Sequence, residues 1–210
     1  MVGRIIETAD CVAEGAHWLA RAEPRFAMAL ALTGPLPLRR QADGFAALLD
    51  AIVGQQVSVA SADAIWRRLE AAGFTNMARM AVASDEELRA AGLSRQKARY
   101  GRALAGAGID FEALRVLPDE AVMATLVAVP GIGRWTAEIY AMFALGRADV
   151  FAAGDLALQE AARLLFGLDQ RPGDKALRTL AEAWSPWRAV AARALWAYYH
   201  HAKAREGVRL

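Results

Sequence analysis

A short hairpin between two predicted helices constrains the fold more than any other stretch of this sequence. Pro130 fixes the backbone where the hairpin begins, and Gly131 and Gly133 permit positive φ angles and a close approach of the backbone to a partner. Apolar residues recur at helical spacing on both sides, which predicts helices over residues 118–127 and 134–146. The N–H groups of the hairpin and of the second helix's first turn would then point the same way and form a seat for a phosphate group.

Helical signals also dominate the rest of the chain. Apolar residues recur every three or four positions, whereas sustained alternation and Asn-Gly turns are absent. Ser84 and Glu87 have the spacing of a capping box, and Ser185-Pro186 predicts an N-cap followed by proline in the first helical position. We therefore expect an all-α fold. Its predicted helices cover residues 10–21, 24–33, 45–53, 57–71, 85–91, 95–107, 118–127, 134–146, 156–166, 174–183 and 186–205.

The composition suits a stable globular protein. The 210 residues are 56% hydrophobic, which is enough to bury a core as one compact unit or as two closely associated lobes. One cysteine, Cys11, excludes an intrachain disulfide and a four-cysteine metal or iron–sulfur site. Acids at positions 7, 10 and 14 interrupt the segment where a signal peptide needs an apolar core, and no stretch approaches the ~18 apolar residues of a membrane span. We expect a soluble, cytoplasmic protein that makes no membrane contact.

The charge balance limits how the chain can bind nucleic acid. The formal net charge is +2, from 25 basic and 23 acidic residues. A protein that gripped an extended duplex through charge alone would be more basic, so we expect a small phosphate footprint. Arg95, Lys97, Arg99 and Arg102 put four basic groups within one predicted helix. They either form a solvated helix face or flank a bound strand.

One acidic residue stands out after the hairpin. Asp155 follows Gly154 and precedes a predicted helix over residues 156–166, so it lies at a helix N-terminus. An N-cap is the commonest role of aspartate in that position, and the local sequence alone favours it. The alternative is a carboxylate that takes part in chemistry, because the N-terminal helix dipole would keep it ionised.

Several ordered motifs resemble the helix-hairpin-helix (HhH-GPD) superfamily of DNA glycosylases, and within it the DNA-3-methyladenine glycosylase II group. The motifs are Val129–Ala137 with Asp155 twenty-two residues after Gly133, Ala51–Ala60, Gly92–Ala98 and Trp184–Arg188. The resemblance implies a helix-hairpin-helix glycosylase fold of two helical lobes with the active-site cleft between them. Lobe A would comprise residues 1–53 and 155–210, and lobe B residues 54–147 with the hairpin at 129–134. The chain begins directly with predicted helices, so it resembles the short form that lacks an N-terminal β domain.

The resemblance implies roles for individual residues. Asp155 is the implied catalytic carboxylate, which stabilises the positive sugar that forms as a glycosidic bond breaks. Trp135, Tyr140 and Trp196 are the implied base pocket, since an aromatic face favours an alkylated, positively charged purine. Ile139 stands where the best-known bacterial relatives have tyrosine, so the base preference stays open.

The DNA contacts follow from the same resemblance. The implied DNA-binding hairpin comprises Pro130, Gly131, Ile132, Gly133 and Arg134. Arg134 is the arginine that we expect on a phosphate. Gln56 is the implied wedge that fills the gap left by a flipped base, although some relatives use an aliphatic residue there. Gln55 is expected as a buried hydrogen-bonding residue.

The resemblance as a whole implies an enzyme of base excision repair. Trp135 stands where bifunctional relatives carry a nucleophilic lysine, so the resemblance implies a monofunctional DNA glycosylase without lyase activity. We expect it to act as a monomer on double-stranded DNA and to hydrolyse the N-glycosidic bond of alkylated bases such as 3-methyladenine. Two alternatives stay open, a glycosylase for deaminated or oxidised bases and a non-catalytic helix-hairpin-helix DNA-binding module. No cofactor and no metal are expected, apart from a monovalent cation that hairpin carbonyls could hold.

Overall fold

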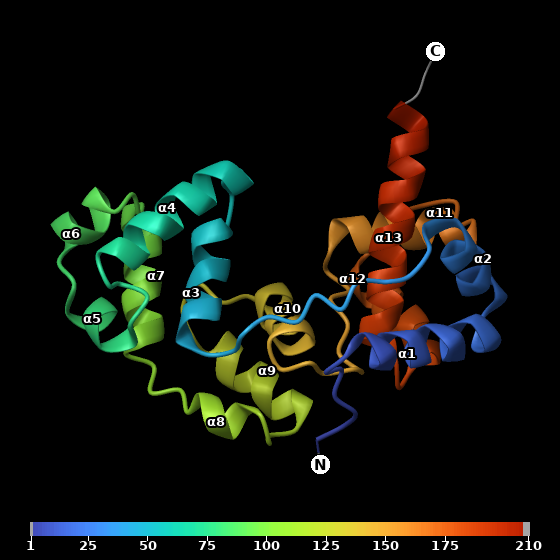
Figure 1. Ribbon diagram of the computed structural model, residues 1–210, viewed down its shortest axis with the longest axis horizontal. Helices are drawn as coiled ribbons and strands as arrows, with labels where there is room; N and C mark the ends of the chain where they lie inside the picture. The colour runs from blue at the N-terminus through green and yellow to red at the C-terminus, as the bar shows by residue number, and fades with distance from the viewer. Residues whose placement is uncertain (1, 208–210) are drawn as a thin grey trace. The chain divides into compact units, whose positions relative to one another are not determined.

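A computed structural model describes residues 2–207, which form an all-α fold, as predicted (Figure 1). Among these residues no β-strand occurs, and one isolated β-bridge joins Ile5 to Arg147. The helices are α1 (Ala9–Ala22), α2 (Pro24–Thr33), α3 (Phe45–Gly54), α4 (Val59–Ala71), α5 (Met77–Val82), α6 (Asp85–Ala90), α7 (Arg95–Ala105), α8 (Phe111–Leu114), α9 (Asp119–Val127), α10 (Arg134–Phe143), α11 (Leu156–Phe166), α12 (Asp174–Leu180), the 3-10 helix η1 (Ala181–Trp184) and α13 (Arg188–Gly207).

The chain divides into two compact units. Unit 1 comprises residues 41–140, and unit 2 comprises residues 2–40 together with the chain from Ala141 onward. These units differ from the expected lobes in two segments. Residues 41–53 belong with the hairpin in unit 1, where α3 packs against α4 and α7, and residues 141–147, expected in the hairpin lobe, belong to unit 2. The later division falls within α10, after Tyr140.

Unit 1 is organised around α7, against which α3, α5 and α6 pack. Gly101 of α7 allows a close approach of its neighbours, since a Cβ atom there would lie 3.2 Å from the sulfur of Met80 and 3.3 Å from Leu49. Helix α8 follows α7 in the chain. After it come α9 and α10, which carry the hairpin between them (Figure 1). The hairpin therefore belongs to a unit with its own packed core.

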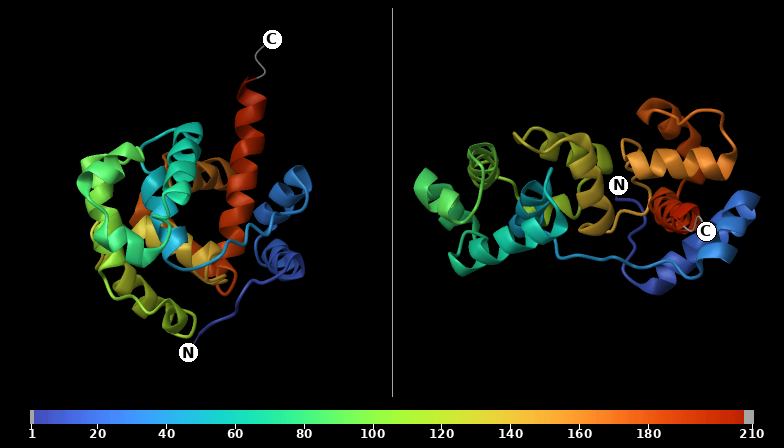
Figure 2. Two further views of the ribbon diagram at one scale, coloured as in Figure 1. Left: turned by 60° about the vertical axis from the view of Figure 1, so that its left-hand side comes forward. Right: turned by 90° about the horizontal axis from the view of Figure 1, so that it is seen from above.

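Unit 2 is organised around α13, which packs against α1, α2 and α11 (Figure 2). The first half of α13, from Ala189 to Trp196, is almost entirely buried and consists largely of alanine, which allows close helix packing. Four aromatic rings form a cluster with centroids 5.3 to 6.0 Å apart. They belong to Phe26, Phe151, Phe166 and Trp184.

Most helix predictions agree with the structure to within three residues, and one cap was wrong. The capping box of Ser84 and Glu87 is present at the start of α6. Ser185, however, is not the N-cap of α13: its hydroxyl donates to Asp149 at 2.8 Å, and the helix begins at Arg188. No helix within residues 2–207 is long and apolar enough to cross a bilayer.

Candidate functional site

Gly131 is required by the packing of unit 1. Its φ angle is +93°, in the region that favours glycine, and a Cβ atom there would lie 2.4 Å from Cγ of Tyr100. Its carbonyl oxygen accepts a hydrogen bond from Nε2 of Gln55 at 3.0 Å, and Gln55 is half-buried. The hairpin is thus held from two sides by residues far away in the sequence.

Gly133 has a different environment. Its φ angle is not positive, it is exposed, and no heavy atom of the described residues outside its immediate neighbourhood lies within 4 Å of the position of a Cβ atom. The packing of unit 1 therefore does not require glycine here. A glycine that leaves open space allows an external group to approach the backbone N–H groups at the start of α10.

Arg134, the first residue of α10, is both oriented and exposed. Its Nε atom donates to Oε1 of Glu138 at 2.9 Å, one helical turn later. The Glu138 side chain is 3% exposed, whereas the Arg134 side chain is 61% exposed. A buried carboxylate thus fixes an arginine that still faces solvent beside the hairpin.

Trp135 and Tyr140, both predicted for the base pocket, differ in exposure. Trp135 is 45% exposed, whereas Tyr140 is 5% exposed and its hydroxyl accepts a hydrogen bond from the backbone N–H of Gly44 at 2.8 Å. Burial raises the pKa of Tyr140 to about 12. In unit 1 Tyr140 therefore holds the residue that precedes α3, and its part in a base pocket stays a prediction.

Gln56, the predicted wedge, lies in a tight turn between α3 and α4. It is exposed and its φ angle is +56°, which is uncommon for a residue other than glycine. Two anchors flank the turn. Nζ of Lys97 donates to the carbonyl oxygen of Val53 at 2.7 Å, and the Ser58 hydroxyl accepts from the N–H of Ser61 at the start of α4. The bond from Lys97 connects the turn that contains Gln56 to α7, and the bond from Gln55 to Gly131 connects it to the hairpin.

The partial burial of Lys97 lowers the pKa of its ammonium group. Of the basic residues on α7, Arg102 donates to the carbonyl oxygen of Ala83 at 3.1 Å and pairs with Asp85. These two contacts, with that of Lys97, are structural. Arg95 and Arg99 are exposed.

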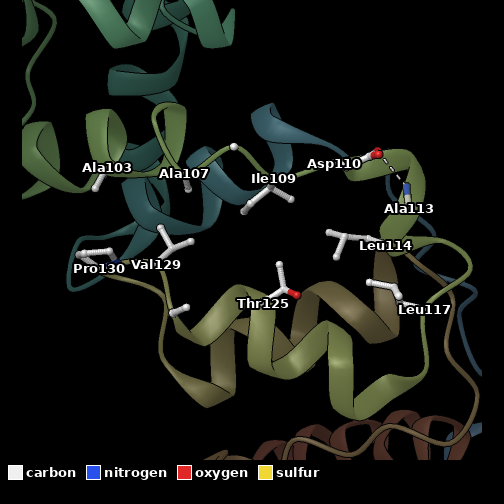
Figure 3. A pocket seen from close by; sticks show the side chains of 12 residues that line it. Ala103, Ala107, Ile109, Asp110, Ala113, Leu114, Leu117, Thr125, Val129 and Pro130 are labelled. Atoms are coloured by element: carbon white, nitrogen blue, oxygen red, sulfur yellow. Dashed lines mark hydrogen bonds between the residues drawn. The ribbon is translucent and has the colours of Figure 1, made fainter.

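A pocket of about 530 Å³ lies against the inner side of the hairpin (Figure 3). Val129 and Pro130 line one end, and Leu114 and Leu117 of the α8 region line the other. Its one carboxylate, Asp110, caps α8 by accepting a hydrogen bond from the N–H of Ala113 at 3.0 Å. The pocket is mostly apolar and its carboxylate is engaged in capping, so it supports the hairpin rather than offering a reactive group.

The predicted monovalent cation would bind to carbonyl oxygens of the hairpin. Those of Val129 and Gly133 accept backbone hydrogen bonds at 3.0 Å, from Ile132 and Ala137 respectively, and that of Gly131 accepts the Gln55 amide. A cation at these oxygens would share them with protein donors. No cluster of three metal-ligating side chains occurs within the described part of the chain.

Asp155, in unit 2, is the N-cap of α11. Its Oδ1 atom accepts hydrogen bonds from the backbone N–H groups of Ala157 at 2.9 Å and Leu158 at 3.0 Å. The residue is neither fully buried nor fully exposed. The N-cap predicted from local sequence is therefore confirmed. The same geometry holds a carboxylate at the positive end of a helix.

Trp196 contacts that carboxylate. The side chain is 8% exposed, and its Nε1 atom donates to Oδ1 of Asp155 at 3.3 Å. The indole also packs on Phe143, with ring centroids 5.8 Å apart. Two predicted site residues thus meet within unit 2. This hydrogen bond could not be predicted from the sequence, because 41 positions separate its partners.

The chain is similar to known proteins over most of its length. A family model described as HhH-GPD superfamily base excision DNA repair protein matches residues 49–187. The chain is 32% identical to YfjP of Bacillus subtilis over 115 residues, which are 53% of this chain and 40% of that protein. It therefore spans less than half the length of this relative.

Two solved structures are similar over most of the chain. A DNA-3-methyladenine glycosidase from Bacillus halodurans is 34% identical, with a TM-score of 0.81 and 91% of each chain covered. The 3-methyladenine DNA glycosylase Mag1 of Schizosaccharomyces pombe, in complex with abasic DNA, is 26% identical, with a TM-score of 0.76. That match covers 87% of this chain and 95% of the other.

Proposed function

We propose that this chain, which belongs to the HhH-GPD superfamily of base excision DNA repair proteins, is a DNA glycosylase that hydrolyses the N-glycosidic bond of alkylated bases. 3-Methyladenine is the representative substrate, and double-stranded DNA is the partner. The observation that carries the proposal is the carboxylate of Asp155, which accepts three hydrogen bonds on Oδ1 at a helix N-terminus in a protein of this superfamily.

The proposed chemistry requires a fixed negative charge beside the sugar. Breaking the bond between base and sugar leaves positive charge on the sugar, and a carboxylate beside it stabilises that charge or activates the attacking water. The three hydrogen bonds to Asp155 fix its position before the reaction, so little reorganisation is needed in the transition state. Water is then the only co-reactant.

The proposed DNA contacts lie in unit 1. The exposed start of α10, with Gly133 and Arg134, suits a backbone phosphate, and the exposed Gln56 suits the space left by a flipped base. Extruding a base costs a few kcal/mol, and less at a damaged pair, so a space-filling side chain would stabilise the flipped state. We propose that the protein binds as a monomer.

The substrate preference is proposed from the aromatic residues. An alkylated purine carries positive charge, and the faces of Trp135 and Trp196 would attract it through stacking and cation–π interaction. An alkylated base also has a weakened bond to the sugar, so a pocket of modest selectivity would suffice. Trp135 in place of a nucleophilic lysine supports hydrolysis without a lyase step.

The test is base release from DNA of defined damage. The protein is incubated with methylated duplex, and with duplexes carrying hypoxanthine or 8-oxoguanine, and the released bases are separated by chromatography. We expect 3-methyladenine among the products. Release only of deaminated or oxidised bases would replace the substrate assignment. Tight DNA binding without release of any base would identify a non-catalytic binding module.

A further inference from the structure

Three arginines lie close together in unit 2 without a carboxylate between them. Arg193 is 1% exposed, although it carries a charge. Its Nη2 and Nε atoms donate to the carbonyl oxygen of Leu38 at 2.9 and 3.3 Å, and its Nη1 atom donates to that of Ala189 at 2.9 Å. Its guanidinium therefore bonds only to neutral backbone oxygens.

Arg40 is used in the same way. Its Nη1 atom donates to the carbonyl oxygen of Phe143 at 3.2 Å and also to that of Ala144. Among the described residues, no aspartate or glutamate forms an ion pair with Arg39, Arg40 or Arg193. Burial, followed by the charges of Arg39 and Arg40, lowers the pKa of Arg193 to about 10. Arg193 therefore remains protonated at neutral pH, and no carboxylate of the described residues compensates the positive charge of the cluster.

Such a cluster costs stability in the free protein. Removing a cation from water is unfavourable unless an anion lies nearby, and like charges add repulsion. Neutral carbonyl groups compensate only part of that cost. An anionic ligand bound at the cluster would supply the missing negative charge.

Arg39 is the member of the cluster that can reach such a ligand. Arg39 and Arg40 are both exposed and Arg193 is buried, but the guanidinium of Arg40 already bonds to two backbone carbonyl oxygens. The φ angle of Arg39 is +52°, a strained conformation for a residue other than glycine. Strain of this kind occurs most often where a side chain is held for a function.

A continuous set of contacts connects the cluster to the candidate catalytic carboxylate. The guanidinium carbon of Arg193 lies 4.7 Å from the ring centroid of Phe143. Phe143 packs on Trp196 at 5.8 Å between centroids, and Trp196 donates to Asp155. All four residues belong to unit 2, so two aromatic rings separate the positive cluster from the carboxylate.

We propose that Arg39 binds a backbone phosphate of the DNA strand that carries the excised base, while Arg40 and Arg193 strengthen the positive potential around it. The inference rests on the proposed glycosylase function. A phosphodiester is the fitting ligand, because guanidinium binds phosphate oxygens in a two-pronged geometry. The connection to Asp155 favours DNA over an acidic protein, since the strand to be cleaved at a glycosidic bond must pass that carboxylate. This phosphate contact would be additional to the one at the hairpin.

The test compares variants in which the positive charge at position 39 is removed or retained. Arg39→Gln removes the charge, Arg39→Lys retains it, and Arg21→Gln is the matched control, since Arg21 is an exposed arginine on α1 of the same unit. Binding to an undamaged duplex and to a duplex with an abasic analogue is titrated at several salt concentrations. Melting temperatures confirm that the variants fold.

We expect Arg39→Gln to reduce the slope of log affinity against log salt by about 0.9 on both duplexes. Between 50 and 200 mM salt, wild type should therefore lose roughly three to four times more affinity than this variant. Arg39→Lys and Arg21→Gln should keep the wild-type slope.

Three results would overturn the inference: an unchanged slope in Arg39→Gln, an equal loss in Arg21→Gln, or Arg39-dependent binding of polyglutamate without Arg39-dependent binding of DNA, which would indicate an acidic protein. Base release by wild type is measured separately. A protein that shows the Arg39 effect but releases no base would retain this phosphate site while the glycosylase assignment fails.

Discussion

At the scale of single residues, one carboxylate combines an observed structural role with a proposed catalytic one. Oδ1 of Asp155 caps α11, and the negative charge of the group is proposed to stabilise the sugar cation. Asp155→Asn separates the two, because asparagine caps helices about as well as aspartate and retains an Oδ1 acceptor. We expect the free energy of unfolding to change by less than about 0.5 kcal/mol. Excision should fall about 10²–10³-fold, the usual effect of removing a preorganised group that stabilises transition-state charge.

The measurement is single-turnover base release beside a thermal melt. Asp110→Asn is the matched control, since Asp110 caps α8 through the same kind of hydrogen bond but belongs to unit 1. That variant should melt like wild type and excise at the wild-type rate. If a folded Asp155→Asn protein also excises normally, the carboxylate is only a helix cap.

At this scale, a hydrogen bond could be predicted from the sequence only where its two partners are close together along the chain. The N-cap role of Asp155 was predictable, because its donors lie two and three residues away. Its bond to Trp196 and the bond of Gln55 to Gly131 were not predictable, since 41 and 76 positions separate the partners. The resemblance to a family indicated that these residues matter, but not that they contact one another.

At the scale of elements, the two hairpin glycines should respond differently to substitution. Gly131→Ala places a Cβ atom 2.4 Å from Tyr100 at a φ angle of +93°, so the free energy of unfolding should fall by about 2 kcal/mol or more. Gly133→Val meets open space, so the melting temperature should stay near wild type. The bulkier residue should instead block a phosphate and weaken binding to damaged and undamaged duplex alike, because phosphates carry no lesion information.

Thermal melts and duplex titrations check both halves of this prediction. Gly173→Val is the matched control, because Gly173, like Gly133, is exposed and has open space around it. Gly108→Val is not suitable, since Gly108 has a φ angle of +64°. The phosphate seat is rejected if Gly133→Val binds duplex as tightly as the Gly173→Val protein and with the same salt dependence.

The elements themselves were largely predictable, because amphipathic spacing repeats over two or more turns in the longer helices. α5 and α8 were missed, since helices of 6 and 4 residues are too short to establish a period. Their caps, Asn76 and Asp110, were the available signal. The N-cap of α13 was predicted wrongly, because the Ser185 side chain bonds to Asp149, which lies 36 positions earlier.

At the scale of the whole molecule, helix α10 belongs to both compact units. Residues up to Tyr140 belong to unit 1 with the hairpin, and residues from Ala141 belong to unit 2 with Asp155. This division could not be predicted from composition, since no flexible or low-complexity linker marks it in the sequence. It follows instead from which parts of the folded chain each half of the helix lies close to. The proposed reaction would involve both units, since unit 1 carries the hairpin that is proposed to bind DNA and unit 2 carries Asp155.

The proposed reaction has an outcome that can be read from the DNA strand itself. A glycosylase with a nucleophilic amine forms a Schiff base with the sugar and then cuts the strand, whereas hydrolysis leaves an intact strand with an abasic site. Trp135, two residues after Gly133, provides no amine. We expect product strands to stay whole until alkali is added, and borohydride to trap no protein–DNA adduct.

Strand cleavage is measured on denaturing gels of end-labelled duplex, with and without alkali. Lys97 is the one lysine before residue 150, and its ammonium donates to the carbonyl oxygen of Val53. Since partial burial lowers its pKa, it is the lysine of unit 1 to test if cleavage is seen. Strand cutting and an adduct that both vanish in Lys97→Arg would contradict the assignment of a purely hydrolytic enzyme, because the amine would then act as the nucleophile. Trp135→Lys supplies the converse arm: an adduct in this variant but not in wild type would show that the tryptophan occupies the position from which an amine reaches the sugar.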